Sequence, residues 1–126
     1  MQVGSQDQPS REIIWYLAKV VPDVERNEPR NVGLILRLAE LQELHYRFAE
    51  GMPFSGCDIA QLQAYKRQVT WWTETMDKYG ARCLFWITKP KDGGSDTNTR
   101  FYLEKAGAAV RPGRVNFDAL YKRLVE

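Results

Sequence analysis

The stretch IIWYLAKVVPDVERNEPRNVGLILRL, residues 13–38, decides the fold. Two runs rich in β-forming residues, 13–21 and 31–38, flank a polar connection over residues 22–30. In the first run both alternating faces are largely apolar, which is typical of a central strand covered on both faces. The connection is long enough for an antiparallel hairpin with an ordered loop rather than a two-residue turn. We therefore expect a sheet that starts from this hairpin.

The connection is the strongest candidate for a site. Pro22 and Pro29 stiffen its two ends because proline fixes φ. Its carboxylates can supply acid–base groups or hard-cation ligands, and its guanidinium groups can bind an anion. The alternative is internal wiring, in which these groups satisfy the loop's backbone and one another. We favour wiring because no nucleophile or histidine accompanies the loop. The loop candidates are Asp23, Arg26, Glu28, Arg30 and Asn31.

Two parts of the chain carry a family resemblance. The matching loop residues are Val21-Pro22-Asp23, Arg26, Glu28 and Asn31-Val32-Gly33. This pattern resembles the bacterial domain-of-unknown-function family 3037, and residues 117–125 resemble that family's terminal helix. The resemblance implies a fold more than an activity. It implies a small accessory bacterial protein of a toxin–antitoxin or phage-defence system, with a kinase resembling the HipA toxin as a conjectured partner.

Length and composition indicate one ordinary globular domain. A chain of 126 residues buries roughly two-thirds of its unfolded surface. Its apolar content of 44% and charged content of 27% are normal for such a domain. We expect a flexible N-terminal arm over residues 1–10 and a single α+β domain over residues 11–126. No apolar run approaches the ~20 residues of a membrane span and we recognise no signal peptide, so we expect no membrane partner. With the family resemblance, this predicts a cytoplasmic protein.

Metal or thiol chemistry is not indicated. Cys57 and Cys83 have no CxxC spacing, and with His45 as the single histidine the chain lacks the usual four-ligand cage. We expect two independent reduced thiols, no metal and no cofactor. His45 falls on the polar face of an expected edge strand, which suits a surface residue. Nucleophile-elbow, phosphate-loop and zinc-protease motifs do not occur, so we assign no catalytic residue.

The two halves of the chain differ in charge. Residues 1–63 hold six basic and nine acidic side chains, a net charge of −3, whereas residues 64–126 hold twelve basic and seven acidic, a net charge of +5. Such an asymmetry can mark a nucleic-acid-binding face, although we favour a mixed solvated surface because the basic residues are scattered among acidic ones. The nucleic-acid candidates are Lys89, Lys91, Arg100, Tyr102, Lys105, Arg111 and Arg114.

The clearest helix covers residues 58–79. Asp58 and Gln61 predict a capping box at its start, and Gly80 predicts its end. One stripe at helical spacing predicts the buried face: Leu62, Tyr65, Val69, Trp72, Met76 and Tyr79. Trp71 lies about 100° from Trp72 around the helix. It is either a flank of the core or an exposed aromatic side chain, and it is our partner-binding candidate.

The remaining segments complete the predicted sheet. Residues 41–49 alternate polar and apolar side chains, as an edge strand does. Residues 82–88 are apolar on both alternating faces, which predicts an inner strand. Residues 100–105 predict an outer strand, with residues 108–110 returning after a turn at Gly107. We therefore expect an α+β fold: an antiparallel sheet of about five strands, with one long central helix and a C-terminal helix packed against it.

Three functions remain open from the sequence. The leading hypothesis is a non-catalytic interaction or regulatory module that docks to another protein, because aromatic side chains are conspicuous and catalytic motifs are absent. The second is nucleic-acid binding by the basic half. The third is a small metal-dependent nuclease or phosphotransfer domain centred on the 22–31 loop. Whether the protein is an enzyme is therefore open, with the pattern favouring a binding module.

Overall fold

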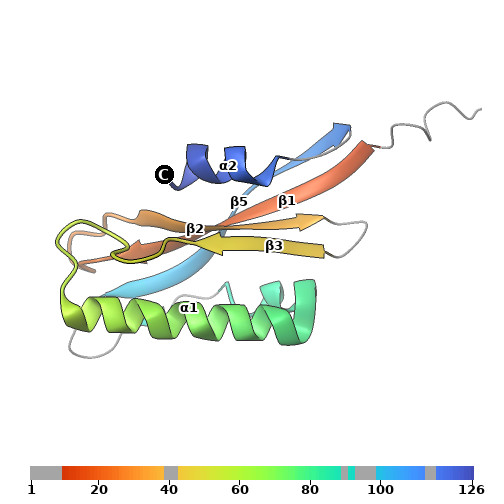
Figure 1. Cartoon of the computed structure of the whole chain (residues 1–126). Helices are drawn as coiled ribbons and strands as arrows, with labels where there is room; N and C mark the ends of the chain where they lie inside the picture. The colour runs from red at the N-terminus through yellow and green to blue at the C-terminus, as the bar shows by residue number, and fades with distance from the viewer. Residues whose placement is uncertain (1–9, 39–42, 89–90, 93–98, 113–115) are drawn as a thin grey trace, which may run out of the picture.

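The computed structural model describes residues 10–38, 43–88, 91–92, 99–112 and 116–126. It has an α+β fold in which an antiparallel sheet lies between two helices, with α1 on one face and α2 on the other (Figure 1). This confirms the predicted fold class and the packing of both helices on the sheet. The expected arm over residues 1–10 lies outside the described residues except for Ser10, which begins the first strand.

The sheet has the strand order β3-β2-β1-β5-β4. Its bounds are Ser10–Val21 for β1, Arg30–Leu38 for β2, Glu43–Phe48 for β3, Lys91–Asp92 for β4 and Arg100–Pro112 for β5. β4 is a pairing of only two residues at the end of β5. The sheet therefore has four full strands instead of the five expected, although its antiparallel character and the edge position of β3 are as predicted.

β1 is the central strand, as its two apolar faces predict. It pairs with β2 on one edge and with β5 on the other. Ala18 and Val20 face the core beneath α1, whereas Leu17 packs with Tyr121 of α2. Each face thus has its own helix, and the burial of both explains why β1 lacks the usual polar alternation.

β5 is one continuous strand, so the predicted turn at Gly107 is wrong. A bulge at Ala106 lets Gly107 lie opposite Trp15 of β1, and the Trp15 ring occupies the space that a Cβ at position 107 would need. Glycine is required here for close packing of an aromatic ring on the backbone, which is a common use of glycine within a strand.

α1 spans Ile59–Tyr79 and confirms the predicted helix. Its capping box is present: the Asp58 side chain accepts a hydrogen bond from the Gln61 N–H, and the Gln61 side chain accepts one from the Asp58 N–H. Tyr65, Trp72 and Met76 are buried as the stripe predicts. The helix ends at Gly80, whose φ of 68° is in the left-handed region that glycine tolerates.

The inner strand predicted over residues 82–88 is absent, and this part of the prediction is wrong. The chain instead turns through a 3₁₀-helix, η2, over Gly80–Phe85. Cys83, Leu84 and Ile87 are buried, while Phe85 and Trp86 between them are exposed. Buried positions at i, i+1 and i+4 follow a helical period, so an apolar run that reads as a two-faced strand is in fact a one-faced turn.

α2 spans Phe117–Leu124 and is capped by Asn116, whose side chain accepts a hydrogen bond from the Ala119 N–H. Tyr121 is its fully buried residue, and the guanidinium of Arg47 lies 4.4 Å from the Tyr121 ring centroid. The polar side of β3 therefore lies on the α2 side of the sheet, where its side chains remain exposed. Among the described residues, no helix is long and apolar enough to cross a membrane.

The contrast between Trp71 and Trp72 gives a direct stability test. Trp72 is 1% exposed and stacks on Phe48 at 5.6 Å, whereas Trp71 is 36% exposed. Trp72→Ala should lower the free energy of unfolding by roughly 3–5 kcal/mol because it empties a buried site. Trp71→Ala should lower it clearly less, and denaturant melts of both variants measure the difference. Equal losses would mean that the two rings are equally important to the core.

Candidate functional site

Asp23 makes the hydrogen bonds that close the turn in the 22–31 loop. Its side-chain Oδ1 accepts a hydrogen bond from the Glu25 N–H at 3.0 Å, and its carbonyl accepts from the N–H groups of Arg26 and Asn27 at 3.1 and 3.0 Å. Asn27 adopts a φ of 53°, a left-handed conformation that asparagine tolerates better than most residues. Asp23 thus organises the turn itself, as the wiring interpretation expects.

Arg26 and Glu28 form an ion pair at the outside of the loop. The Arg26 Nε lies 2.8 Å from Glu28 Oε1, and both side chains are largely exposed. An exposed pair of this kind is worth about 0–1 kcal/mol. The side-chain partner of Arg26 in the loop is thus Glu28, while Arg26 contacts Asp23 through its backbone N–H.

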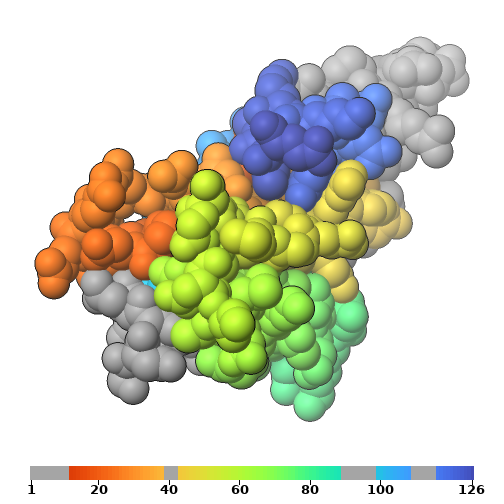
Figure 2. Space-filling view, turned by 60° about the vertical axis from the view of Figure 1, so that its left-hand side comes forward, coloured from red at the N-terminus to blue at the C-terminus, as the bar shows by residue number. Residues whose placement is uncertain are grey.

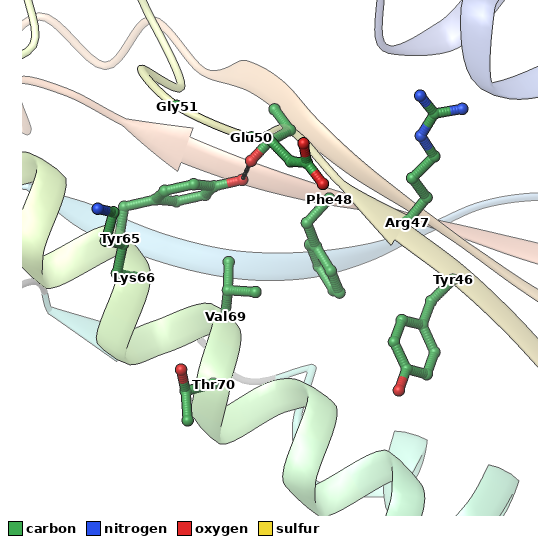
Figure 3. A pocket seen from close by; sticks show the side chains of 10 residues that line it. Tyr46, Arg47, Phe48, Glu50, Gly51, Tyr65, Lys66, Val69 and Thr70 are labelled. Atoms are coloured by element: carbon green, nitrogen blue, oxygen red, sulfur yellow. Dashed lines mark hydrogen bonds between the residues drawn. The ribbon is translucent and has the colours of Figure 1, made fainter.

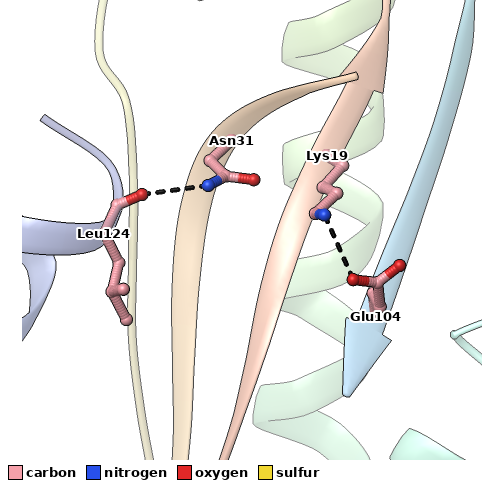
Figure 4. Close-up of polar contacts among 4 residues, drawn as sticks. All are labelled: Lys19, Asn31, Glu104 and Leu124. Atoms are coloured by element: carbon pink, nitrogen blue, oxygen red, sulfur yellow. Dashed lines mark hydrogen bonds and ion pairs between the residues drawn. The ribbon is translucent and has the colours of Figure 1, made fainter. Parts of the chain in front are cut away.

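Asn31 ties the loop to the other end of the chain. Its Nδ2 donates a hydrogen bond to the Leu124 carbonyl at 3.0 Å, which joins the start of β2 to the last turn of α2 (Figure 4). On the neighbouring strands, Lys19 Nζ lies 3.1 Å from Glu104 Oε1. Asn31 therefore satisfies one of the terminal helix carbonyls that have no partner within the helix.

The start of the loop is held by α1. Gln61 Nε2 donates to the Pro22 carbonyl at 3.1 Å and lies 3.3 Å from Thr99 Oγ1. The buried hydroxyl of Thr99 also donates to the Pro22 carbonyl, at 3.2 Å. The sequence identified Gln61 only as part of a capping box. Its second role depends on the spatial neighbours of Pro22, which no local pattern reveals.

Two adjacent hollows open beside the loop, which projects from one end of the molecule (Figure 2). The smaller, of about 230 Å³, brings together four of the five loop candidates with residues 54–56: Asp23, Arg26, Glu28 and Arg30. The larger, of about 500 Å³, places Arg30 beside Asn31 and Lys19. Arg30 is shared by both hollows and is the exposed cation between them.

Metal-binding and thiol chemistry gain no support from the described residues. Within the described ranges, no group of three or more His, Cys, Asp or Glu side chains is placed to hold a metal ion. Burial raises the pKa of the Cys57 and Cys83 thiols, whereas a nucleophilic cysteine needs a lowered pKa. His45 lies 3.5 Å from Glu43 and beside the Phe117 ring.

The nucleic-acid candidates are only partly described. Lys89 and Arg114 lie outside the described residues, and Lys91 and Arg111 are placed only as strand positions in β4 and β5. The other three lie in β5: Arg100, Tyr102 and Lys105.

The three β5 candidates do not share one face. Phe101 and Leu103 point into the core beneath α1, so Tyr102 between them faces the other side of the sheet. Lys105 lies opposite Tyr16, a residue of the α1-side core. The structure therefore places Tyr102 and Lys105 on opposite faces.

Sequence reasoning missed a cluster of exposed aromatic side chains, Tyr79, Phe85 and Trp86, which we call the aromatic cluster. Phe85 is 85% exposed and Trp86 43% exposed. The rings of Tyr79 and Trp86 meet edge to face, with centroids 5.4 Å apart. The sequence pattern instead predicts a buried strand for Phe85 and Trp86 and the buried stripe for Tyr79. The available signal was the 83, 84 and 87 spacing, which leaves positions 85 and 86 on the outside of a turn.

The scaffold role of the loop predicts unequal effects of two substitutions. Asn31→Ala should lower the free energy of unfolding by about 1 kcal/mol because the Leu124 carbonyl loses its donor. Arg26→Ala should lower it by less than about 0.5 kcal/mol because the ion pair is exposed. Thermal or denaturant melts measure both. If Asn31→Ala leaves stability unchanged, the scaffold interpretation is wrong and the loop residues become ligand-binding candidates.

Comparison with known proteins does not supply a function. No family model matches the chain, and no curated protein or solved structure is significantly similar to it. The resemblance of the loop motif to family 3037 stays a prediction. The function must therefore be argued from the geometry of the described surfaces.

Proposed function

We propose that the protein is a small interaction or regulatory module that docks to another protein through the aromatic cluster. The observation that carries this proposal is the exposure of Phe85, 85% of whose surface is open although it lies next to the buried pair Cys83 and Leu84. Burying a phenylalanine side chain is worth about 1.5–3 kcal/mol. Covering Phe85 with a partner surface recovers that free energy.

The cluster has the composition of a protein-binding hot spot. Tryptophan, tyrosine and arginine are enriched among the residues that dominate binding energies. Trp86 and Tyr79 support each other edge to face, which holds two large rings in place before binding. Arg82, which lies between Tyr79 and Trp86 in the sequence, is exposed on η2. A preorganised group of rings loses little conformational entropy when a partner docks.

The charges beside the cluster indicate the chemistry of the partner surface. The Lys78 ammonium lies 5.2 Å from the Tyr79 ring centroid, and Arg82 adds a second cation. A complementary surface would offer an apolar pocket for Phe85 with acidic side chains at its rim. The cluster also lies on the opposite side of the molecule from α2, at the far end of α1 (Figure 1).

The other two hypotheses gain less support from the described residues. Tyr102 and Lys105, the aromatic and basic candidates of the nucleic-acid hypothesis, lie on opposite faces of the sheet. Two carboxylates of the 22–31 loop have partners within it, Asp23 in the turn and Glu28 in the ion pair with Arg26. Both hypotheses remain predictions, and neither has an observation comparable to the exposed rings.

Replacing the exposed rings tests the proposal. A photo-crosslinking residue at position 82 should capture a partner from host extract, and the purified partner should bind the full chain directly. In a direct binding assay, Phe85→Ser with Trp86→Ser should weaken that binding at least about a hundredfold, as loss of a hot spot does. Because both side chains are exposed, the melting temperature should change little.

Ile59→Ser is the control, since it removes another exposed apolar side chain, at the opposite end of α1 from the cluster. The control should bind the partner like the unmodified chain. If the double variant also binds normally, the cluster is not the docking surface. Binding to anionic lipid vesicles that depends on Phe85, without a protein partner, would replace the proposal with a membrane-surface role.

A further inference from the structure

A groove of about 590 Å³ lies between the edge of the sheet and α1 (Figure 3), and its lining includes no residue of the aromatic cluster or of the 22–31 loop. Tyr46 and Phe48 of β3 point from the sheet toward the helix, and Val69 points from α1 toward Phe48. The complete lining is Tyr46, Arg47, Phe48, Ala49, Glu50, Gly51, Tyr65, Lys66, Val69 and Thr70. A continuous piece of strand thus forms one wall and one side of a helix forms the other.

The strand wall presents unpaired backbone groups. β3 is the outermost strand on its side of the sheet, and the described residues include no further strand beside it. The Ala49 N–H donates a hydrogen bond to the Val32 carbonyl of β2 at 2.7 Å. The backbone groups of Ala49, and of every second residue before it, therefore point toward β2. By the antiparallel alternation, the N–H and C=O groups of Leu44, Tyr46 and Phe48 point outward.

The groove is formed before any ligand binds, because two hydrogen bonds join its walls. The Tyr46 hydroxyl donates to Asp77 of α1 at 2.5 Å, and the Tyr65 hydroxyl donates to the Ala49 carbonyl at 2.7 Å. Burial, and then the Asp77 carboxylate, raise the pKa of Tyr46 to about 12, so this donor keeps its proton. A preformed groove avoids the ordering penalty of binding.

The position of Phe48 depends on a glycine. Its ring stacks on Trp72 at 5.6 Å and covers Gly33, where a Cβ would collide with the ring. The apolar floor of the groove is thus built from the core itself. It cannot move aside without loss of that stacking.

We propose that the groove binds an extended, acidic peptide segment of a partner protein, which joins the sheet as a strand beside β3. An extended chain satisfies the outward backbone groups of β3, whereas a helix or a lipid chain has no free backbone groups to offer them. Successive side chains of a strand point to opposite faces, so one set meets Val69 and Thr70 and the other lies on the α2 side.

The charges around the groove favour an acidic segment. The lining holds two cations and one acid: Lys66 is an exposed cation on the helix wall, Arg47 lies on the opposite side of β3, next to α2, and Glu50 is exposed just after the strand. Asp118 and Glu126 lie at 3.9 Å from the Arg47 guanidinium, so the pairs are long and a ligand carboxylate can compete for it. A segment that is mainly apolar, with one acidic side chain toward Lys66 on the α1 side and another toward Arg47 on the α2 side, is complementary to both cations.

The edge is also protected against indiscriminate pairing. β3 has only six residues, and on the α2 side it carries Glu43, His45 and Arg47. Short, charged edge strands resist pairing with arbitrary chains. Selectivity therefore comes from the helix wall, which a segment must fit while it pairs with the strand.

A peptide-display selection tests this proposal. The probe is a phage library of random dodecapeptides selected on the full chain, with counter-selection on Thr70→Trp, which fills the groove at an exposed helix position. Enriched peptides should be mainly apolar and should carry acidic residues. In solution, Lys66→Glu should weaken their binding about fivefold to tenfold through charge reversal. Arg67→Glu, the neighbouring exposed position that does not line the groove, should leave binding unchanged.

A proline scan of the best peptide identifies strand pairing. Proline should reduce binding at least about tenfold at alternate positions, those whose N–H bonds β3, and have little effect between them. Phe85→Ser should leave peptide binding intact, so failure of this site is distinct from failure of the aromatic cluster. Absence of peptides specific for the open groove, or binding that ignores Thr70→Trp and the proline register, would overturn the proposal.

Discussion

The burial of β1 on both faces and both edges is the constraint on which the rest of the structure depends. An apolar strand of this kind needs a partner strand on each side for its backbone groups and a helix on each face for its side chains. β2 and β5 are the partner strands, and α1 and α2 are the helices on the two faces. The two helices differ greatly in length, and the shorter α2 lies over only part of its face of the sheet (Figure 1).

Much of this arrangement could be predicted, because β1 is apolar on both faces and α1 has a clear helical period with recognisable caps. The Asp58 capping box and Gly80 set the ends of α1 within one residue of the prediction. The strand prediction for the segment after Gly80 failed because a short apolar run fits a strand and a turn equally well. Which of its side chains are exposed is evident only from the three-dimensional structure. The predicted turn at Gly107 failed for a related reason, because a glycine can mark a turn or make room for a ring such as that of Trp15.

The candidate sites were less predictable than the fold. The charged residues of the 22–31 loop are visible in the sequence, and the structure gathers four of them around one hollow. Their contacts are mainly internal, which agrees with the wiring interpretation. The aromatic cluster and the β3 groove arise instead from tertiary geometry. The sequence indicated that β3 is an edge strand, but the distance at which α1 runs beside it depends on rings such as Phe48 and Trp72.

The pairing of β1 with β5 has a consequence for the order in which the molecule assembles. Residue 21 pairs with residue 100 and residue 10 with residue 112, so β1 acquires its second neighbour only when almost the whole chain has been synthesised. Until then β1, β2 and β3 can form a meander in which one long edge of β1 is open, and open apolar edges promote association between nascent chains. If synthesis stops before β5 emerges, the released chain would have an unpaired edge on its central strand, and this edge would be prone to aggregation.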